Sequence, residues 1–211
     1  MFTNRTSKFL ILIGLGFTLS ISSCTDNVQK ADAQEHIDIP ITFIPNQNDT
    51  ITLQDVFAYC DDNNFSKELA ILVNLAPHSG NFRLFAINLL TQDTLIRGLV
   101  AHGHCKGTED RFATFSNEIG SNCSSLGHYA IGGHYTGSFG SSFKLTGLDS
   151  CNSNAQARFV VLHGHPCIPN EEQEDDICLS QGCPTVSPEV LEQLEPMIEN
   201  SSKPVLLWIY D

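Results

Sequence analysis

The residues that can perform chemistry lie in three short runs of the chain. They read His-Gly-His-Cys at 102–105, His-Gly-His-Pro-Cys at 163–167 and Ser-Gln-Gly-Cys at 180–183. A cysteine attacks a carbonyl carbon as the thiolate, and the pKa of a free thiol is about 8.5, so a cysteine nucleophile needs a nearby imidazole or another positive group. Imidazole and thiolate are also the usual ligands of zinc. These runs therefore favour either a cysteine nucleophile assisted by histidine or a metal site.

The first 23 residues have the organisation of a bacterial lipoprotein signal peptide. A positively charged start precedes an apolar run over 9–21 that is short for a bilayer span, and Ser-Ser-Cys24 follows directly. This order resembles a lipobox, in which a peptidase cuts before a cysteine that becomes the acylated N-terminus. We therefore expect residues 1–23 to be a signal peptide and Cys24 to be the lipid anchor. Thr25, in place of an Asp, slightly favours the outer membrane, on the periplasmic side of the envelope.

Composition limits what the exported part can be. The chain has 211 residues, of which 41% are apolar and 17% charged, so one folded domain is expected rather than disorder or a coiled coil. The formal net charge is −13 and no basic stripe is present. Phosphate neutralisation, and with it nucleic-acid binding, is therefore not expected.

The expected elements divide the chain into a tether and one domain. Residues 24–50 are polar and form the tether, with a short strand expected at 37–44, and the domain covers 51–211. Helices are predicted over 53–60, capped by Thr52, and from Ser187-Pro188 onward, where Pro196 should kink or end the helix. Strands are predicted at 69–75, 82–89, 94–102, 129–131, 142–145, 158–162 and 205–210. The fold class is therefore mainly β with little helix.

The cysteine count leaves one thiol to explain. Seven cysteines remain after Cys24, and cysteines of exported proteins are normally paired. Six could form three disulfides, with 15 connectivities that sequence cannot choose between. One bridge is predicted: Cys167 and Cys178 bracket an acidic run, which we expect to be a solvated loop that the disulfide closes.

The order of the motifs resembles the YkuD-like L,D-transpeptidases, and most closely their murein L,D-transpeptidase catalytic-domain subfamily. The resemblance runs from about residue 65 to the C-terminus. The segments that carry it are Ala101-His102-Gly103, Phe115-Ser116-Asn117, Ser124-Ser125-Leu126-Gly127-His128-Tyr129, Tyr135-Thr136-Gly137, Leu145-Thr146-Gly147-Leu148, Asn154-Ala155-Gln156-Ala157-Arg158, Val161-Leu162-His163-Gly164 and Ser180-Gln181-Gly182-Cys183-Pro184. The family implies a β-sandwich or mixed sheet with a few short helices.

The resemblance assigns roles to individual residues. Cys183 is the nucleophile, and His163 takes the thiol proton and later gives it to the leaving amine. The carbonyl of Gly164 orients the imidazole, and Gly182 lets the backbone approach a developing oxyanion. Cys183 also precedes a predicted helix, whose N-terminus would help to activate the thiol. Cys183 is then the unpaired cysteine of the disulfide count.

The family's reaction is an acyl transfer on peptidoglycan. The nucleophile cleaves the bond after the diaminopimelate of a tetrapeptide stem, and the amine of a second stem resolves the thioester into a 3→3 crosslink. Water as acceptor would make a carboxypeptidase. Ser180 and Gln181 are expected to line the acyl site, with Ser125 to Ile131 beneath it. Thr185 stands where many relatives have an Arg, and with the acidic loop it places substrate anchoring in question.

Other readings compete for the same residues. The six residues His102, His104, Cys105, His163, His165 and Cys167 could form a zinc hydrolase site, although disulfide formation competes for the cysteines. A wall-binding lipoprotein without catalysis is a third hypothesis. Apart from this hypothesis, ordinary structural contacts are expected for His104, His128, His134, His165, Asn154 and Arg158. We favour the enzyme, with no cofactor or metal, peptidoglycan stem peptides as partners and a lipid anchor in the membrane.

Overall fold

A computed structural model describes residues 51–106 and 111–211 of the protein. The signal peptide, the lipidation site at Cys24, the tether over 24–50 and the strand expected at 37–44 lie outside the described residues. None of the helices in the described part is long and apolar enough to cross a membrane.

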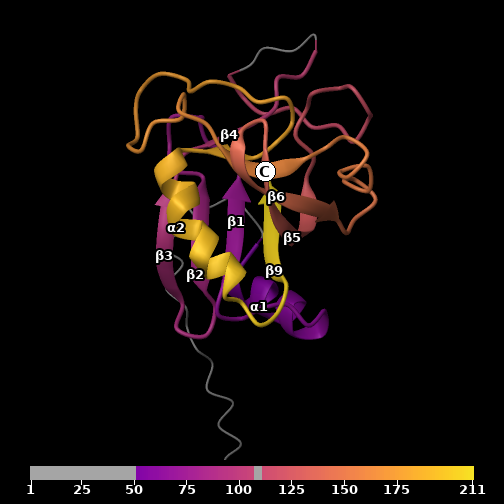
Figure 1. Ribbon diagram of the computed structural model, residues 1–211, viewed down its shortest axis with the longest axis vertical. Coiled ribbons are helices and arrows are strands. Elements are labelled where there is room, and N and C mark those ends of the chain that lie inside the picture. Colours follow the sequence, from indigo (N-terminus) through magenta and orange to yellow (C-terminus); the bar gives the residue numbers. More distant parts are fainter. Residues whose placement is uncertain (1–50, 107–110) are drawn as a thin grey trace, which may run out of the picture. The chain divides into compact units, whose positions relative to one another are not determined.

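Strands from all parts of the described chain form one mixed sheet of nine strands (Figure 1). Its order is β3-β2-β1-β9-β5-β6-β7-β8-β4. The bounds are β1 Ala70–Asn74, β2 Leu84–Asn88, β3 Asp93–Gly98, β4 Val100–Ala101, β5 Gly127–Gly137, β6 Gly140–Gly147, β7 Val161–Gly164, β8 Thr185–Val186 and β9 Val205–Tyr210. The prediction of a mainly β fold with a mixed sheet is confirmed.

Each face of the central strands packs against a different helix. On β1, Ile71 and Val73 belong to the core that includes α2 (Pro188–Glu199), and Ala70 and Leu72 belong to the core that includes α1 (Leu53–Asp62). Figure 1 shows α2 running across one face of the sheet in front of β2 and β3. Strands buried on both faces need continuous apolar sequence rather than alternation, which is why these strands appear in the sequence as short apolar runs.

Both helices begin at the predicted caps. The Thr52 side chain accepts from the Asp55 backbone, and the Asp55 side chain accepts from Thr52, which completes a capping box. Ser187 caps α2, with Pro188 as its first residue. Pro196 does not end α2, because the helix continues to Glu199 with its apolar face packed in the core.

Several predicted strands have different limits in the structure, and the short runs at 129–131 and 142–145 extend into the longer β5 and β6. The run over 94–102 divides at Leu99 into β3 and β4, which lie at opposite ends of the strand order, so the nine-stranded sheet is nearly closed. The run over 158–162 becomes a strand only at Val161. Arg158 is in a turn, and Phe159 has a positive φ of 56°, which a strand does not allow.

Two disulfides link the described cysteines. The predicted pair Cys167–Cys178 is confirmed, and a second bridge joins Cys105 to Cys123. The remaining cysteines do not complete a third pair. Cys60 is buried in the α1 core, Cys151 is exposed, and Cys183 is half-buried, so three described thiols are free instead of one.

The acidic loop closed by Cys167–Cys178 is anchored to the rest of the domain. Asp176 Oδ1 lies 2.6 Å from His78 Nε2 and accepts from the Ser79 hydroxyl at 3.3 Å. Glu172 accepts from the backbone N–H of Phe82 at 2.8 Å. The expectation of a solvated loop is therefore half correct, since its acidic side chains are largely exposed but its backbone is docked.

Candidate active site

The parallel pairing of β7 with β8 brings the predicted nucleophile and base onto neighbouring segments. His163 on β7 is in register with Thr185 on β8. Cys183 lies two residues before Thr185, and Val161 lies two residues before His163. Cys183 is therefore opposite Val161 in the same parallel register. The Val161 N–H accordingly donates to the Cys183 sulfur at 3.4 Å. Cys183 and His163 therefore lie on adjacent segments, two register positions apart.

The His163 side chain is 4% exposed and held by partners on both nitrogens. Nδ1 donates to the carbonyl oxygen of Gly164 at 3.1 Å, which leaves Nε2 with its lone pair, 3.0 Å from the Thr185 hydroxyl. The Phe139 ring stacks on the imidazole, with 4.4 Å between centroids. Burial lowers the pKa of His163, as does the neighbouring His165, while Gly164 raises it. The imidazole is thus neutral at neutral pH and free to act as a base.

The Cys183 thiol is half-buried and protonated in this arrangement. Burial raises its pKa, while the Val161 N–H and the positive charge of Arg158 lower it. The thiol donates weakly to the Phe159 carbonyl, with 3.7 Å between sulfur and oxygen. Within the described chain its hydrogen bonds go to Val161 and Phe159, so the thiol needs a base to remove its proton before it can attack.

The expected help from a helix N-terminus is not found. Helix α2 begins at Pro188, and β8 with Ser187 separates it from Cys183. The short strand forms there because Thr185 and Val186 complete ladders with β7 on one side and β4 on the other. The positive influence on the thiol comes instead from the Arg158 guanidinium.

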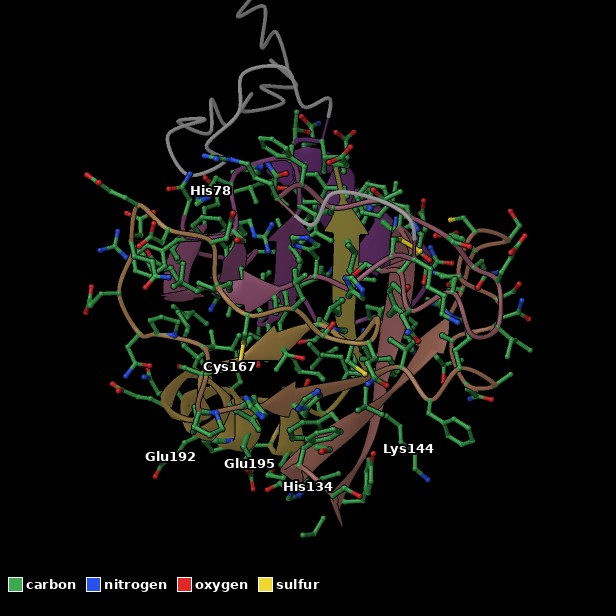
Figure 2. All side chains as sticks on the ribbon, turned by 90° about the horizontal axis from the view of Figure 1, so that it is seen from above. His78, His134, Lys144, Cys167, Glu192 and Glu195 are labelled. Carbon is green, nitrogen blue, oxygen red and sulfur yellow. A yellow bond between two sulfur atoms is a disulfide. The ribbon has the colours of Figure 1, made fainter. Side chains whose placement is uncertain are left out.

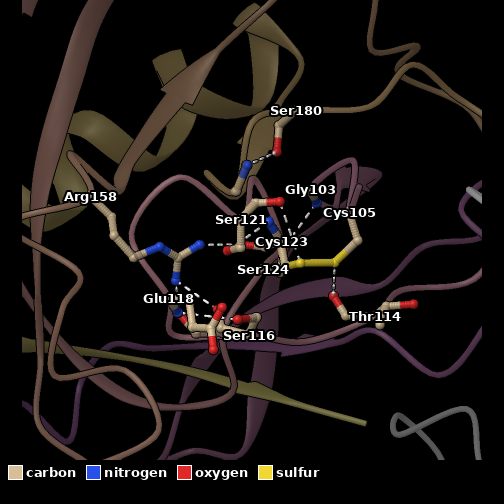
Figure 3. Close-up of a disulfide and its surroundings, with 12 residues drawn as sticks. Gly103, Cys105, Thr114, Ser116, Glu118, Ser121, Cys123, Ser124, Arg158 and Ser180 are labelled. Carbon is tan, nitrogen blue, oxygen red and sulfur yellow. Dashed lines mark hydrogen bonds between the residues drawn. A yellow bond between two sulfur atoms is a disulfide. The ribbon is translucent and has the colours of Figure 1, made fainter. Parts of the chain in front are cut away.

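Arg158 lies beside residues 180–183, which we call the nucleophile loop, and its guanidinium makes three hydrogen bonds (Figure 3). Nη1 donates to the Ser116 carbonyl at 2.8 Å and to the Ser125 hydroxyl at 3.1 Å, and Nη2 donates to the Cys123 carbonyl. A Cβ added at Gly182 would lie 3.1 Å from Nη2, which places the guanidinium directly beside the residue before the nucleophile. Arg158 therefore has a more specific place than the structural contact expected from sequence. Asn154, by contrast, bonds to Asn117 as a structural residue.

The residues before Cys183 are fixed by their backbone. Ser180 forms a bridge with Gly103, donating its N–H to the His102 carbonyl at 2.9 Å and accepting from the His104 N–H at 2.8 Å. Its hydroxyl accepts from the Gly182 N–H at 3.1 Å. Ser180 therefore orders the loop, while the exposed side chain of Gln181 is the one directed to solvent.

The Cys105–Cys123 disulfide connects the two segments that support this loop (Figure 3). Cys105 follows the segment that pairs with Ser180, and the Cys123 carbonyl accepts from Arg158. Ser124 adds a hydrogen bond, its hydroxyl accepting from the Gly103 N–H at 3.0 Å. The bridge therefore ties both supports of the nucleophile loop together.

Gly182 is expected not to tolerate a side chain. Its φ is +110°, and a Cβ would lie 2.8 Å from the Cys123 carbonyl oxygen. We expect Gly182→Ala to destabilise the fold by about 1–2 kcal/mol and to slow acylation of Cys183, since the strain falls on the residue next to the thiol. Urea unfolding and the acylation rate measure the two effects. Gly133→Ala is the control, because a Cβ there meets nothing within 4 Å; equal behaviour of the two variants would contradict the prediction.

The six residues of the zinc hypothesis are divided among separate contacts. Cys105 and Cys167 belong to different disulfides, and the His102 imidazole lies 3.2 Å from the buried Arg83 guanidinium. In the described residues, two groups of side chains bring three possible ligand atoms together, and neither is the predicted set. One is His165, Cys167 and Cys178, whose sulfurs are bonded to each other, and the other is His134 with Glu195 and Glu199. The predicted zinc site is therefore not formed by this fold.

The group of His134, Glu195 and Glu199 joins the β5–β6 hairpin to α2 (Figure 2). His134 Nδ1 lies 2.7 Å from Glu199, and Ser141 links Nε2 to Glu195 through bonds of 2.8 Å and 2.7 Å. The structural role expected for His134 is thus supported by its contacts. His128 likewise pairs with Asp149 and stacks on Tyr59.

Sequence reasoning missed three residues that surround the dyad. Thr185 was treated as a departure from a pattern, although its position two residues after Cys183 gives it the strand register of His163. Arg158 was detectable as an arginine five residues before His163. Phe139, in the β5–β6 turn, has no signal in the sequence, because its contact with His163 depends on tertiary structure.

A half-buried thiol and a neutral imidazole that a backbone carbonyl orients, carried on adjacent segments, are the groups that cysteine acyl transfer uses. A family model described as L,D-transpeptidase catalytic domain matches residues 47–210. The chain belongs to this family, an enzyme family of the L,D-transpeptidase type, as the sequence motifs predicted.

Solved structures resemble the chain distantly. One is the helical cell shape determining protein Pgp2 from Campylobacter jejuni, with 12% identity and a TM-score of 0.46 over 75% of this chain and 56% of that one. A lysine-to-alanine mutant of Pgp2 gives 13% identity and a TM-score of 0.45 over 76% and 55%. The chain thus spans little more than half of Pgp2. No curated protein sequence matches.

Proposed function

We propose that the chain is a peptidoglycan L,D-transpeptidase that acts through a thioester on Cys183. The observation that carries the proposal is the fixed imidazole of His163. Its Nδ1 donates to the Gly164 carbonyl, so the basic Nε2 is directed toward the segment that contains the nucleophile. The family to which the chain belongs supports the reaction class, and the roles of Cys183 and His163 are the proposal's own.

The first half of the reaction forms the acyl-enzyme. Nε2 of His163 takes the thiol proton while the sulfur bonds to the carbonyl carbon of diaminopimelate, and the carbonyl electron pair moves to oxygen. The backbone N–H of Cys183 is the proposed donor to the developing oxyanion, because the Gly182 N–H already donates to the Ser180 hydroxyl. The carbon–nitrogen bond then breaks, and the proton on Nε2 leaves with D-alanine.

The second half depends on the acceptor. The side-chain amine of a second stem attacks the thioester, loses its proton to Nε2 and forms a 3→3 crosslink, while the sulfur regains a proton. Attack by water at the same carbon releases a tripeptide, which is carboxypeptidase activity. We further propose that the enzyme works at the periplasmic face of the envelope, held by lipid on Cys24, because of the signal-peptide pattern over 1–23.

Product analysis by mass spectrometry tests this function. The full chain, purified in detergent with its disulfides formed, is incubated with disaccharide-tetrapeptides beside Cys183→Ala and Cys151→Ala variants. We expect crosslinked dimers from the wild type and from Cys151→Ala, which loses an exposed thiol that donates to the Leu126 carbonyl, and none from Cys183→Ala. Tripeptides alone would establish the carboxypeptidase. Products that persist in Cys183→Ala, or a wild type without any product, would refute the assignment.

A further inference from the structure

The Thr185 hydroxyl lies between the base and the main chain of the nucleophile. Thr185 is 3% exposed, and its Oγ1 is 3.0 Å from His163 Nε2 and 3.3 Å from the carbonyl oxygen of Cys183. The parallel register that pairs His163 with Thr185 keeps the hydroxyl in this place. One hydroxyl therefore contacts both members of the proposed dyad.

The hydrogen-bond inventory gives each contact a direction. The Gly164 carbonyl can only accept, so Nδ1 carries the proton of the neutral ring and Nε2 has a lone pair. The Thr185 hydroxyl then donates to Nε2. If Nε2 is protonated, the hydroxyl must accept from it, and its own hydrogen can turn to the Cys183 carbonyl. A hydroxyl can serve both states because it is donor and acceptor at once.

We propose that Thr185 is a positioning residue that directs His163 Nε2 toward the nucleophile and accepts the hydrogen bond of the imidazolium during the reaction. This inference rests on the proposed function of Cys183 and His163. The proton that moves is the thiol proton, which passes from sulfur to Nε2 as the sulfur–carbon bond forms and leaves with the amine as the carbon–nitrogen bond breaks. Thr185 keeps its own proton throughout. Because Nε2 has a single lone pair, the Thr185 hydrogen turns from Nε2 to the Cys183 carbonyl as the thiol proton arrives, and the hydroxyl oxygen then accepts from the imidazolium.

The surroundings of His163 leave no substitute for this hydroxyl. The ring is 4% exposed, Phe139 covers one face, and Leu191 of α2 packs close to Gly164. The titratable group that acts on the ring is His165, which disfavours the imidazolium. An imidazolium formed here without Thr185 would lose a buried hydrogen bond, and bonds to charged groups are the costly ones to remove.

The test compares Thr185→Val, which removes the hydroxyl at nearly constant volume, with Thr185→Ser, which keeps it. Carbapenem acylation of Cys183 is followed by intact mass against pH, and the His163 pKa is measured by ¹⁵N NMR of labelled histidine. We expect Thr185→Val to slow acylation about 10- to 100-fold and to lower the His163 pKa, and Thr185→Ser to restore both. Thr94→Val on β3, where the threonine pairs with Ile87 of β2, is the control for the same substitution in another strand.

The outcomes separate this inference from the function on which it rests. A Thr185→Val variant with the wild-type rate and the wild-type His163 pKa would overturn the inference, as would a loss that serine does not restore. If the valine variant does not fold, Thr185→Ala provides the same comparison. If wild-type Cys183 is not acylated at all, the proposed function fails, and the NMR titration still decides whether Thr185 controls His163.

Discussion

Replacing His163 by Gln is expected to slow acylation of Cys183 by about 10²- to 10⁴-fold at neutral pH, the usual contribution of a general base. The structure leaves the thiol protonated, because burial raises its pKa. Glutamine fills most of the buried space of the imidazole but cannot take a proton. The rate of carbapenem acylation, read by intact mass spectrometry, measures the effect.

The deficit should shrink as the pH rises. In the wild type the rate increases as His163 loses its proton, and because its pKa lies below the ordinary value, the rate levels off before neutrality. Without the imidazole the rate follows the thiolate fraction of Cys183, whose pKa is raised, so it continues to climb at alkaline pH. His104→Gln is the control, since His104 holds the loop through its backbone N–H. A constant ratio of the two rates between neutral and alkaline pH would exclude His163 as the base.

The parts of the fold that follow from local sequence were predictable. The N-caps at Thr52 and Ser187 predict where both helices begin, because a side-chain acceptor there satisfies backbone N–H groups that have no partner within the helix. Apolar runs identify β1, β2 and β9, since burial on both faces requires them. The strand β8 has two residues and exists only through ladder partners distant in the chain, so no local pattern could reveal it. The residues of β4 were predicted as the end of one longer strand, but its separation from β3 depends on the pairing with β8.

The same distinction applies to the candidate site. Cys183 and His163 are visible as motif residues at the ends of predictable elements. Arg158 also lies in a motif segment, but its role is not visible in the sequence, because its three acceptors come from residues 116–125, which approach it only in the folded chain. The one predicted disulfide was accessible from its short acidic loop, whereas Cys105–Cys123 depends on how two supports of the nucleophile loop meet. Spacing along the chain thus locates reactive groups but not the groups that hold them.

Arg158→Met is expected to lower the free energy of unfolding by about 2–4 kcal/mol, because buried acceptors that lose a charged donor retain the cost of their desolvation. The Ser116 and Cys123 carbonyls and the Ser125 hydroxyl lose this donor together. The methionine keeps most of the aliphatic bulk, so the loss reflects the hydrogen bonds rather than a cavity. Urea unfolding with both disulfides intact measures the change.

Arg158→Met should also change the pKa of the Cys183 thiol, which is measured independently of stability. The positive charge of Arg158 lowers the pKa of Cys183 against the effect of burial, so its removal raises that pKa further. Alkylation of Cys183 against pH, resolved by peptide mass spectrometry, should therefore shift to higher pH in Arg158→Met and less in Arg158→Lys, which keeps the charge but loses the paired donors. Arg97→Met is the control, because Arg97 is exposed and its guanidinium lies over the Phe82 ring. If Arg158→Met unfolds like Arg97→Met and its alkylation profile matches the wild type, Arg158 neither supports the nucleophile loop nor acts on the thiol.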